Sequence, residues 1–103
     1  MGLRVLLFLV LIPTFVQAEL QSLKILDQGG LVRGMKQVEG PTTVTVEGVA
    51  SDLQITLQSL DKIEPEKEGE RAGNKVTFRG VSPGIWRITG SQEGISKVTI
   101  TPQ

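Results

Sequence analysis

The chain of 103 residues contains no cysteine, no histidine and no tyrosine, and its aromatic residues are one tryptophan and three phenylalanines. Without cysteine there is no disulfide, so a hydrophobic core has to stabilise the fold. Without histidine the usual Ser-His arrangement for nucleophilic catalysis is missing, and metal binding is left to oxygen ligands. We therefore expect a protein that is not an enzyme and that needs no cofactor.

An excess of one charge is also missing, because 11 Lys and Arg residues balance 11 Asp and Glu residues. A nucleic-acid partner would require a basic excess, so none is expected. The acidic residues Glu64, Glu66, Glu68 and Glu70 alternate along one segment, yet they lack the Asp/Asn-Gly spacing of a calcium loop. The sequence therefore predicts no metal site.

Residues 1–18 have the features of a secretory signal peptide. A single cation, Arg4, precedes the apolar run Val5–Ile12, and small or β-branched residues at Val16 and Ala18 suit a cut after Ala18. The run is shorter than the roughly 20 residues that span a bilayer, although an uncleaved anchor is the alternative. We expect residues 19–103 to form one domain, exported to the periplasm or the extracellular space, with no stable membrane span after cleavage.

The clearest structural pattern is Lys75–Gly90, which predicts a strand, a tight turn at Pro83 and Gly84, and a second strand. Phe78 on the first strand and Trp86 on the second alternate with polar residues, as half-buried strands require. We expect Trp86 to lie in the core around which the rest of the chain packs.

Alternation of apolar and polar residues also predicts strands at 42–47, 53–58 and 95–101, and an irregular strand at 31–38 with a bulge at Gly34. Residues 19–28 fit either a helical face or a strand, and a short strand near 23–26 is favoured. Residues 61–74 combine charges with Pro65 and two glycines, which predicts an exposed, flexible acidic loop.

Six or seven short strands, joined by glycine-containing turns and without a helix, predict an all-β fold. The expected architecture is a small single-domain β-sandwich with an immunoglobulin-like or transthyretin-like outline.

A family resemblance rests on Val76-Thr-Phe78, Gly80-Val81, Pro83-Gly84 and Trp86-Arg-Ile88. This run resembles the signature of carboxypeptidase-regulatory-like and prealbumin-like modules, in which a strand is followed by apolar-x-Pro-Gly-x-aromatic-x-apolar. The resemblance covers residues 75–89 chiefly and residues 42–101 loosely, and the acidic segment before the signature departs from it. It implies a β-sandwich that acts as a structural or binding unit of an exported protein and performs no chemistry itself.

The segment Gly80-Val-Ser82-Pro83-Gly84 also matches G-x-S-x-G, the nucleophile elbow of the α/β-hydrolases. That elbow uses the backbone N–H of the residue after the serine, and Pro83 has none. The segment is therefore interpreted as a turn.

A candidate binding site follows if the strands near 75–79, 85–89 and 95–101 belong to one sheet. Alternation then places Arg79, Arg87 and Lys97 together on the outward face, among threonines. Such a basic, hydroxyl-rich patch would suit an acidic protein partner or an anionic glycan. The alternative is a solvated sheet face whose cations discourage edge-to-edge association.

The function expected from the sequence is that of an exported, non-enzymatic interaction or accessory subunit of an envelope or secreted assembly, or a scaffold piece of one. The alternative is a small-ligand or glycan-binding carrier on the same fold. A carrier needs a concave pocket with a few convergent polar groups. An assembly subunit needs a long unpaired edge strand or an exposed apolar patch.

Overall fold

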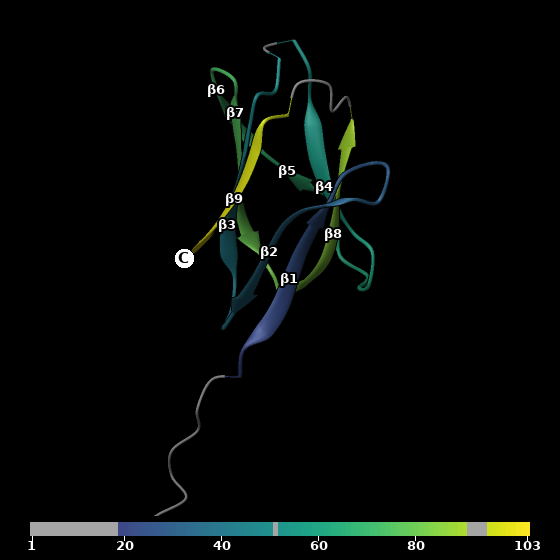
Figure 1. Ribbon diagram of the computed structural model, residues 1–103, viewed down its shortest axis with the longest axis vertical. Coiled ribbons are helices and arrows are strands. Elements are labelled where there is room, and N and C mark those ends of the chain that lie inside the picture. Colours follow the sequence, from purple (N-terminus) through teal and green to yellow (C-terminus); the bar gives the residue numbers. More distant parts are fainter. Residues whose placement is uncertain (1–18, 51, 91–94) are drawn as a thin grey trace, which may run out of the picture.

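Two β-sheets pack face to face in the computed structural model, which describes residues 19–50, 52–90 and 95–103 (Figure 1). The first sheet has five strands in the order β2-β1-β8-β4-β5, and the second has four in the order β6-β7-β3-β9. The strands are β1 (Gln21–Leu26), β2 (Val32–Val38), β3 (Thr42–Glu47), β4 (Ile55–Ser59), β5 (Lys67–Glu68), β6 (Glu70–Ala72), β7 (Lys75–Val81), β8 (Gly84–Gly90) and β9 (Lys97–Pro102). The predicted all-β sandwich is confirmed, with the very short β5 and β6 beyond the strands expected. The predicted leader, residues 1–18, lies outside the described residues.

The core lies between the two sheets and is built from the inward positions of both. Its side chains are Leu23, Ile25, Leu57, Trp86 and Ile88 from the five-stranded sheet and Val44, Val46, Val76, Phe78 and Val81 from the four-stranded sheet, with further buried residues at the margins. Trp86 is fully buried, as the sequence predicts. Leu53, expected as the first buried residue of a strand, is instead half-buried, because β4 begins two positions later at Ile55.

The first strand of the domain occupies an interior position in the five-stranded sheet. β1 pairs with β2 on one side in antiparallel fashion and with β8 on the other side in parallel fashion, so that Ile25 lies beside Trp86. The strand interpretation of residues 19–28 is therefore confirmed, and the helical one is wrong. The second strand also contains a bulge, but at Arg33 and not at Gly34 as predicted, because Ile25 opposes Gly34 and Leu26 opposes Val32.

The strand-turn-strand unit at Lys75–Gly90 is not a hairpin within one sheet. β7 belongs to the four-stranded sheet and β8 to the five-stranded sheet, so the turn between them carries the chain across the sandwich. The two strands bring Phe78 and Trp86 to the same core from opposite layers. At the turn, Gly84 has a φ of 138°, in the region that favours glycine.

The expectation that residues 61–74 form a loop is wrong for the second half, which contains two short strands, while the flexibility of the segment stays a prediction. The segment is largely exposed, but it forms β5 against β4 and then β6 against β7, crossing between the sheets at Gly69. A Cβ atom at Gly69 would overlap Val76 and lie 3.0 Å from a ring carbon of Phe78. Backbone rather than side chain therefore packs against the core at this point.

The side chain of Arg71 fixes the end of the same segment. Its guanidinium donates hydrogen bonds to the carbonyl oxygens of Val49 at 3.3 Å, of Gly73 at 3.2 Å and of Leu53. These bonds join β6 to the connection between β3 and β4. The segment is thus held by backbone pairing and by one cation, neither of which requires apolar residues of its own.

Candidate interaction surface

The three residues of the predicted basic patch do not lie on one sheet. Arg79 on β7 and Lys97 on β9 are both exposed on the four-stranded sheet, where β3 separates their strands. Arg87 lies on β8 in the five-stranded sheet, half-buried. The prediction of a single patch is therefore wrong, because the turn before β8 takes that strand into the other layer.

The cations of the four-stranded sheet have carboxylates of the same chain beside them. Arg79 Nε lies 3.7 Å from Glu70 Oε2, and Lys75 Nζ lies 3.3 Å from Glu47 Oε1. Lys97 is opposite Glu47 in the register of β3 with β9. These charges compensate one another locally, so this face presents no concentrated positive charge.

Threonine occupies the middle of the same face. Thr45 on β3 is flanked by Thr77 on β7 and by Thr99 on β9, and Thr43 is opposite Thr101. Cross-strand threonine pairs of this kind stabilise a solvated sheet. The outer surface of the four-stranded sheet therefore follows the ordinary rule of an apolar inner face and a polar outer face.

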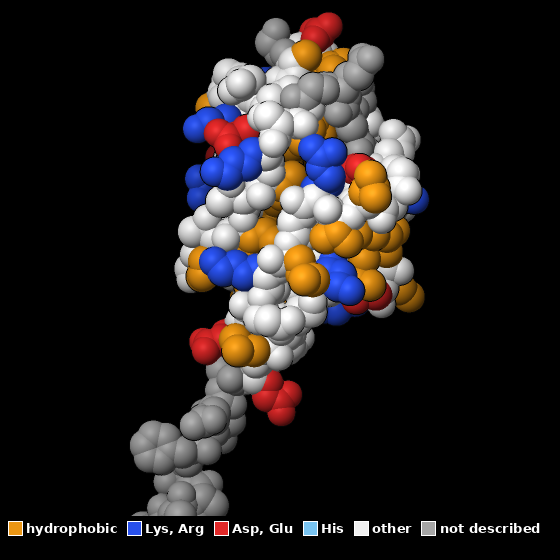
Figure 2. Space-filling view, viewed as in Figure 1, with side chains coloured by type: hydrophobic (Ala, Val, Ile, Leu, Met, Phe, Trp, Pro, Cys, Tyr) orange, Lys and Arg blue, Asp and Glu red, His pale blue; other side chains and the backbone are white. Residues whose placement is uncertain are grey.

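The outer surface of the five-stranded sheet departs from that rule. The strand registers place two rows of side chains across β2, β1, β8 and the end of β4, and we call these eight residues the apolar–cationic patch. One row is Met35, Lys24, Ile85 and Leu60, and the other is Val32, Leu26, Arg87 and Gln58. Figure 2 shows hydrophobic side chains gathered over β1, β2 and β8 with Lys or Arg side chains between them.

Exposure varies across the patch in a regular way. Met35 and Val32 on β2 are 61% and 53% exposed, and Leu60 on the far side is 45% exposed. The central residues on β1 and β8 are half-buried. The apolar groups at the margins therefore stand more open to solvent than the two cations and two apolar residues between them.

The two cations of the patch have no carboxylate partner among the described residues. Arg87 donates from Nη2 to the amide oxygen of Gln58 at 2.8 Å, while its Nε is buried without an acceptor. The ion pairs within the described part of the chain involve Arg33, Lys75 and Arg79 instead. The nearby carboxylate of Asp61 accepts a hydrogen bond from the backbone N–H of Ile85 at 3.1 Å.

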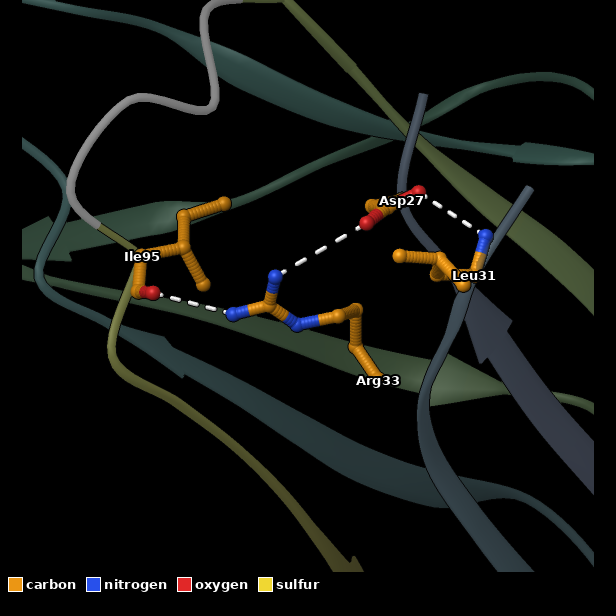
Figure 3. Close-up of polar contacts among 4 residues, drawn as sticks. All are labelled: Asp27, Leu31, Arg33 and Ile95. Atoms are coloured by element: carbon orange, nitrogen blue, oxygen red, sulfur yellow. Dashed lines mark hydrogen bonds and ion pairs between the residues drawn. The ribbon is translucent and has the colours of Figure 1, made fainter. Parts of the chain in front are cut away.

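The edges of the two sheets offer little room for a further strand. β5 and β6 span only two and three residues. On the other side of the sandwich, the bulged Arg33 donates to the carbonyl oxygen of Ile95 at 2.9 Å and lies 3.7 Å from Asp27 (Figure 3). Lys36 donates in the same way to Ile100 of β9 at 3.4 Å. A bulge and inward-pointing charges are devices that protect sheet edges from pairing.

Asp27 holds the start of β2 in place for these contacts. Its Oδ1 accepts the backbone N–H of Leu31 at 2.9 Å, and its backbone N–H donates to the carbonyl oxygen of Leu31 at 2.9 Å. The turn between β1 and β2 thus directs Arg33 towards β9 (Figure 3). These polar contacts cover the β2 edge, whereas the outer face of the five-stranded sheet keeps exposed apolar side chains at its margins.

A concave pocket of about 540 Å³ lies at the edge of the sandwich away from β2 and β9, between β4 and the segment of β5 and β6. Leu53, Ile55 and Val76 supply its apolar wall, and Asp52 and Glu68 place carboxylates at its rim. Arg71, which also lines it, is already engaged with three backbone carbonyls. The pocket lacks an aromatic platform for a sugar ring among its lining residues.

The G-x-S-x-G segment forms the turn between β7 and β8. The hydroxyl of Ser82 donates to Glu64 Oε2 at 2.9 Å, and its carbonyl oxygen accepts the indole N–H of Trp86 at 2.9 Å. These bonds fix the turn and the buried tryptophan.

Two further kinds of site concern metal ions and membranes. Within it there is no group of three or more acidic side chains that could hold a metal ion. The same residues include no helix of the length and hydropathy needed to cross a membrane.

Sequence reasoning found Arg87 but missed its apolar neighbours. Met35 and Val32 lie on opposite sides of a bulge, so strict alternation would have placed them on different faces, and the bulge brings both outward.

A comparison of the chain with protein-family models, with curated proteins and with solved structures finds no match.

Proposed function

We propose that this protein is an exported, non-enzymatic interaction subunit of an envelope or secreted assembly, and that it docks through the apolar–cationic patch. The observation that carries the proposal is the outward apolar surface of the five-stranded sheet. In a β-sandwich the outer positions are ordinarily polar, as they are on the four-stranded sheet of the same molecule. A contiguous exposed apolar surface of this kind is typical of a contact with another macromolecule.

The closed edges support docking by a face rather than by addition of a strand. The short β5 and β6 and the donors Arg33 and Lys36 all reduce edge pairing. The resemblance to carboxypeptidase-regulatory-like modules points in the same direction, since it implies a binding unit without chemistry of its own.

The pocket beside β5 and β6 supports a second candidate, a carrier of a small ligand. Its volume of about 540 Å³ falls within the range of small-molecule sites, and its rim carboxylates would suit a cationic or hydroxyl-rich ligand. A glycan is less well matched, because no aromatic residue is among those that line the pocket.

A paired comparison tests the proposal. The variant Met35→Ser/Ile85→Ser removes apolar area from the patch, and Thr45→Ser/Thr99→Ser alters the opposite face with little change in polarity. We expect the unaltered protein and the threonine control to migrate in a complex on native gels of the envelope or secretion fraction, and the patch variant to migrate alone. Migration of all three as free monomers would reject an interaction subunit, and an unchanged complex in the patch variant would reject this surface.

A further inference from the structure

We propose that the apolar–cationic patch receives one amphipathic segment of a partner protein, and that a carboxylate on the apolar face of that segment is bound by Arg87 with Lys24 beside it. This inference rests on the proposed function and adds the chemistry of the partner. It follows from the charges of the patch, its width and the state of the Arg87 side chain.

The charges of the patch are all of one sign. The outward positions of the three strands β1, β2 and β8 are Ser22, Lys24, Leu26, Val32, Met35, Gln37, Ile85, Arg87 and Thr89. None of these is a carboxylate, whereas each ion pair on the other sheet is closed within the chain. Lys24 and Arg87 sit diagonally on adjacent strands, because Lys24 is opposite Ile85 and Leu26 is opposite Arg87. An anionic group of the partner placed between them supplies the carboxylate that these two cations lack among the described residues.

The guanidinium of Arg87 is oriented by one hydrogen bond and keeps a donor that can bind such a group. It is held at Nη2 by Gln58, and its Nε–H has no acceptor where it now lies. A buried donor without an acceptor is unfavourable, so moving Nε towards a partner's carboxylate sacrifices no hydrogen bond at that atom. Arg–carboxylate pairs are also among the strongest charge-assisted hydrogen bonds, since the planar group can donate to both oxygens.

The dimensions of the patch fit one segment. Its rows extend over four neighbouring strands, which at a spacing of about 4.8 Å gives a width of roughly 14 Å. A helix with its side chains is about 10–12 Å across. The exposed side chains at the two margins, Val32 and Met35 on β2 and Leu60 beyond β4, can therefore contact the flanks of a single helix seated over the half-buried centre.

Two other occupants fit less well. A second copy laid face to face would bring Lys24 and Arg87 against the same unpaired cations. A bilayer surface would use apolar groups that project into the hydrocarbon, and the central residues Leu26 and Ile85 are half-buried in the sheet. A protein segment can supply both apolar side chains and a carboxylate at the required depth.

Site-specific photocrosslinking in the source cells tests the inference with the full chain. A benzophenone side chain is introduced at Met35 in one version and at Thr45, on the opposite face, in the control. We expect a protein adduct from position 35 alone. We also expect the crosslinked peptide, identified by mass spectrometry, to contain Asp or Glu within an amphipathic stretch.

A charge exchange then tests the pairing itself. The crosslinked segment is synthesised with its carboxylates and, separately, with the corresponding amides. We expect the amide peptide to bind the unaltered protein at least about tenfold more weakly. We expect Arg87→Glu to abolish binding of the acidic peptide, and a lysine in place of the peptide carboxylate to restore it. Arg79→Glu, on the other sheet, should leave binding unchanged, and urea unfolding of each variant confirms that it is folded.

The outcomes separate the two proposals. If no adduct forms with any protein from position 35, the proposed function fails. If a protein adduct forms but the amide peptide binds as well as the acidic one, the interaction subunit stands and the carboxylate pairing is overturned. An adduct with lipid or with a second copy of the chain overturns the inferred partner. If Arg87→Glu fails to fold, Lys24→Glu provides the same exchange at the neighbouring cation, and unchanged binding there also overturns it.

Discussion

Trp86 and Ser82 are joined by a hydrogen bond of 2.9 Å from the indole Nε1 to the carbonyl oxygen of Ser82. Ser82 lies in the turn that crosses the sandwich, Trp86 lies four positions later on β8, and Pro83 between them is buried. The bond fixes the turn to the largest side chain of the core. One hydrogen bond therefore stabilises both the crossing between the sheets and the buried position of Trp86.

Truncation of the Trp86 side chain should lower the stability of the fold more than any other single change in the chain. Trp86→Ala should lower the free energy of unfolding by about 3–5 kcal/mol, in a domain whose total stability is roughly 4–13 kcal/mol. Trp86→Phe keeps most of the apolar contact but leaves the Ser82 carbonyl without its donor, and should cost about 1–3 kcal/mol. Urea unfolding followed by circular dichroism measures both. A midpoint for Trp86→Ala equal to that of the unaltered chain would place the indole outside the core.

The backbone approach at Gly69 gives a second prediction. Gly69→Ala should destabilise the fold by about 1–3 kcal/mol, because the new Cβ overlaps Val76 and meets the ring of Phe78. Gly40→Ala is the matched control, since no atom lies within 4 Å of a Cβ at that position. Equal unfolding midpoints for the two variants would show that the segment of β5 and β6 moves away from the core at little cost.

Arg71 and Arg79 provide a matched pair of cations. Arg71 donates to three backbone carbonyls, whereas Arg79 forms one exposed ion pair with Glu70. Arg71→Ala should therefore cost about 1–3 kcal/mol of unfolding free energy, and Arg79→Ala less than about 1 kcal/mol. Amide hydrogen exchange should also rise in residues 67–72 of the Arg71 variant alone. Unchanged protection there would mean that backbone pairing suffices to hold the segment.

Removal of the two side-chain donors at the β2 edge should lower the solubility of the protein rather than its stability. Arg33→Ala/Lys36→Ala removes the side chains that donate to Ile95 and Ile100, and so exposes the edge of β9. The variant should self-associate with rising concentration, because an unprotected edge strand pairs with another copy. Light scattering after size-exclusion chromatography measures this, with Lys97→Ala as the control on the face of the same sheet. A monodisperse double variant would assign edge protection to other features.

The sequence predicted well which side chains of each strand face the core, but it predicted poorly which strands lie next to one another. Alternation placed Val44, Val46, Phe78 and Trp86 inward, because burial of an apolar side chain depends on its own strand. The sheet that each strand joins depends on where the turn sends the chain, and a Pro-Gly turn serves a hairpin and a crossing equally well. Arg87 was therefore assigned to the wrong surface.

The short β5 and β6 were missed for a different reason. Their residues carry no apolar alternation, since the pairing is held by backbone hydrogen bonds, by Gly69 against the core and by the Arg71 side chain. A glycine between two charged pairs was the available signal, and it favours close backbone approach only once a neighbour is known. The apolar–cationic patch was missed because its residues come together only through the pairing of β1 with β2 and with β8, which the pattern within each strand does not reveal.

The parallel pairing of β1 with β8 has a consequence for how the protein is made. The central contact between Ile25 and Trp86 joins positions separated by roughly sixty residues, and such non-local pairings make a chain slow to fold, on the order of milliseconds to seconds. The five-stranded sheet cannot close before β8 has been synthesised. Until β8 is present, β1 lacks its parallel neighbour, and the buried pair of Ile25 and Trp86 cannot form.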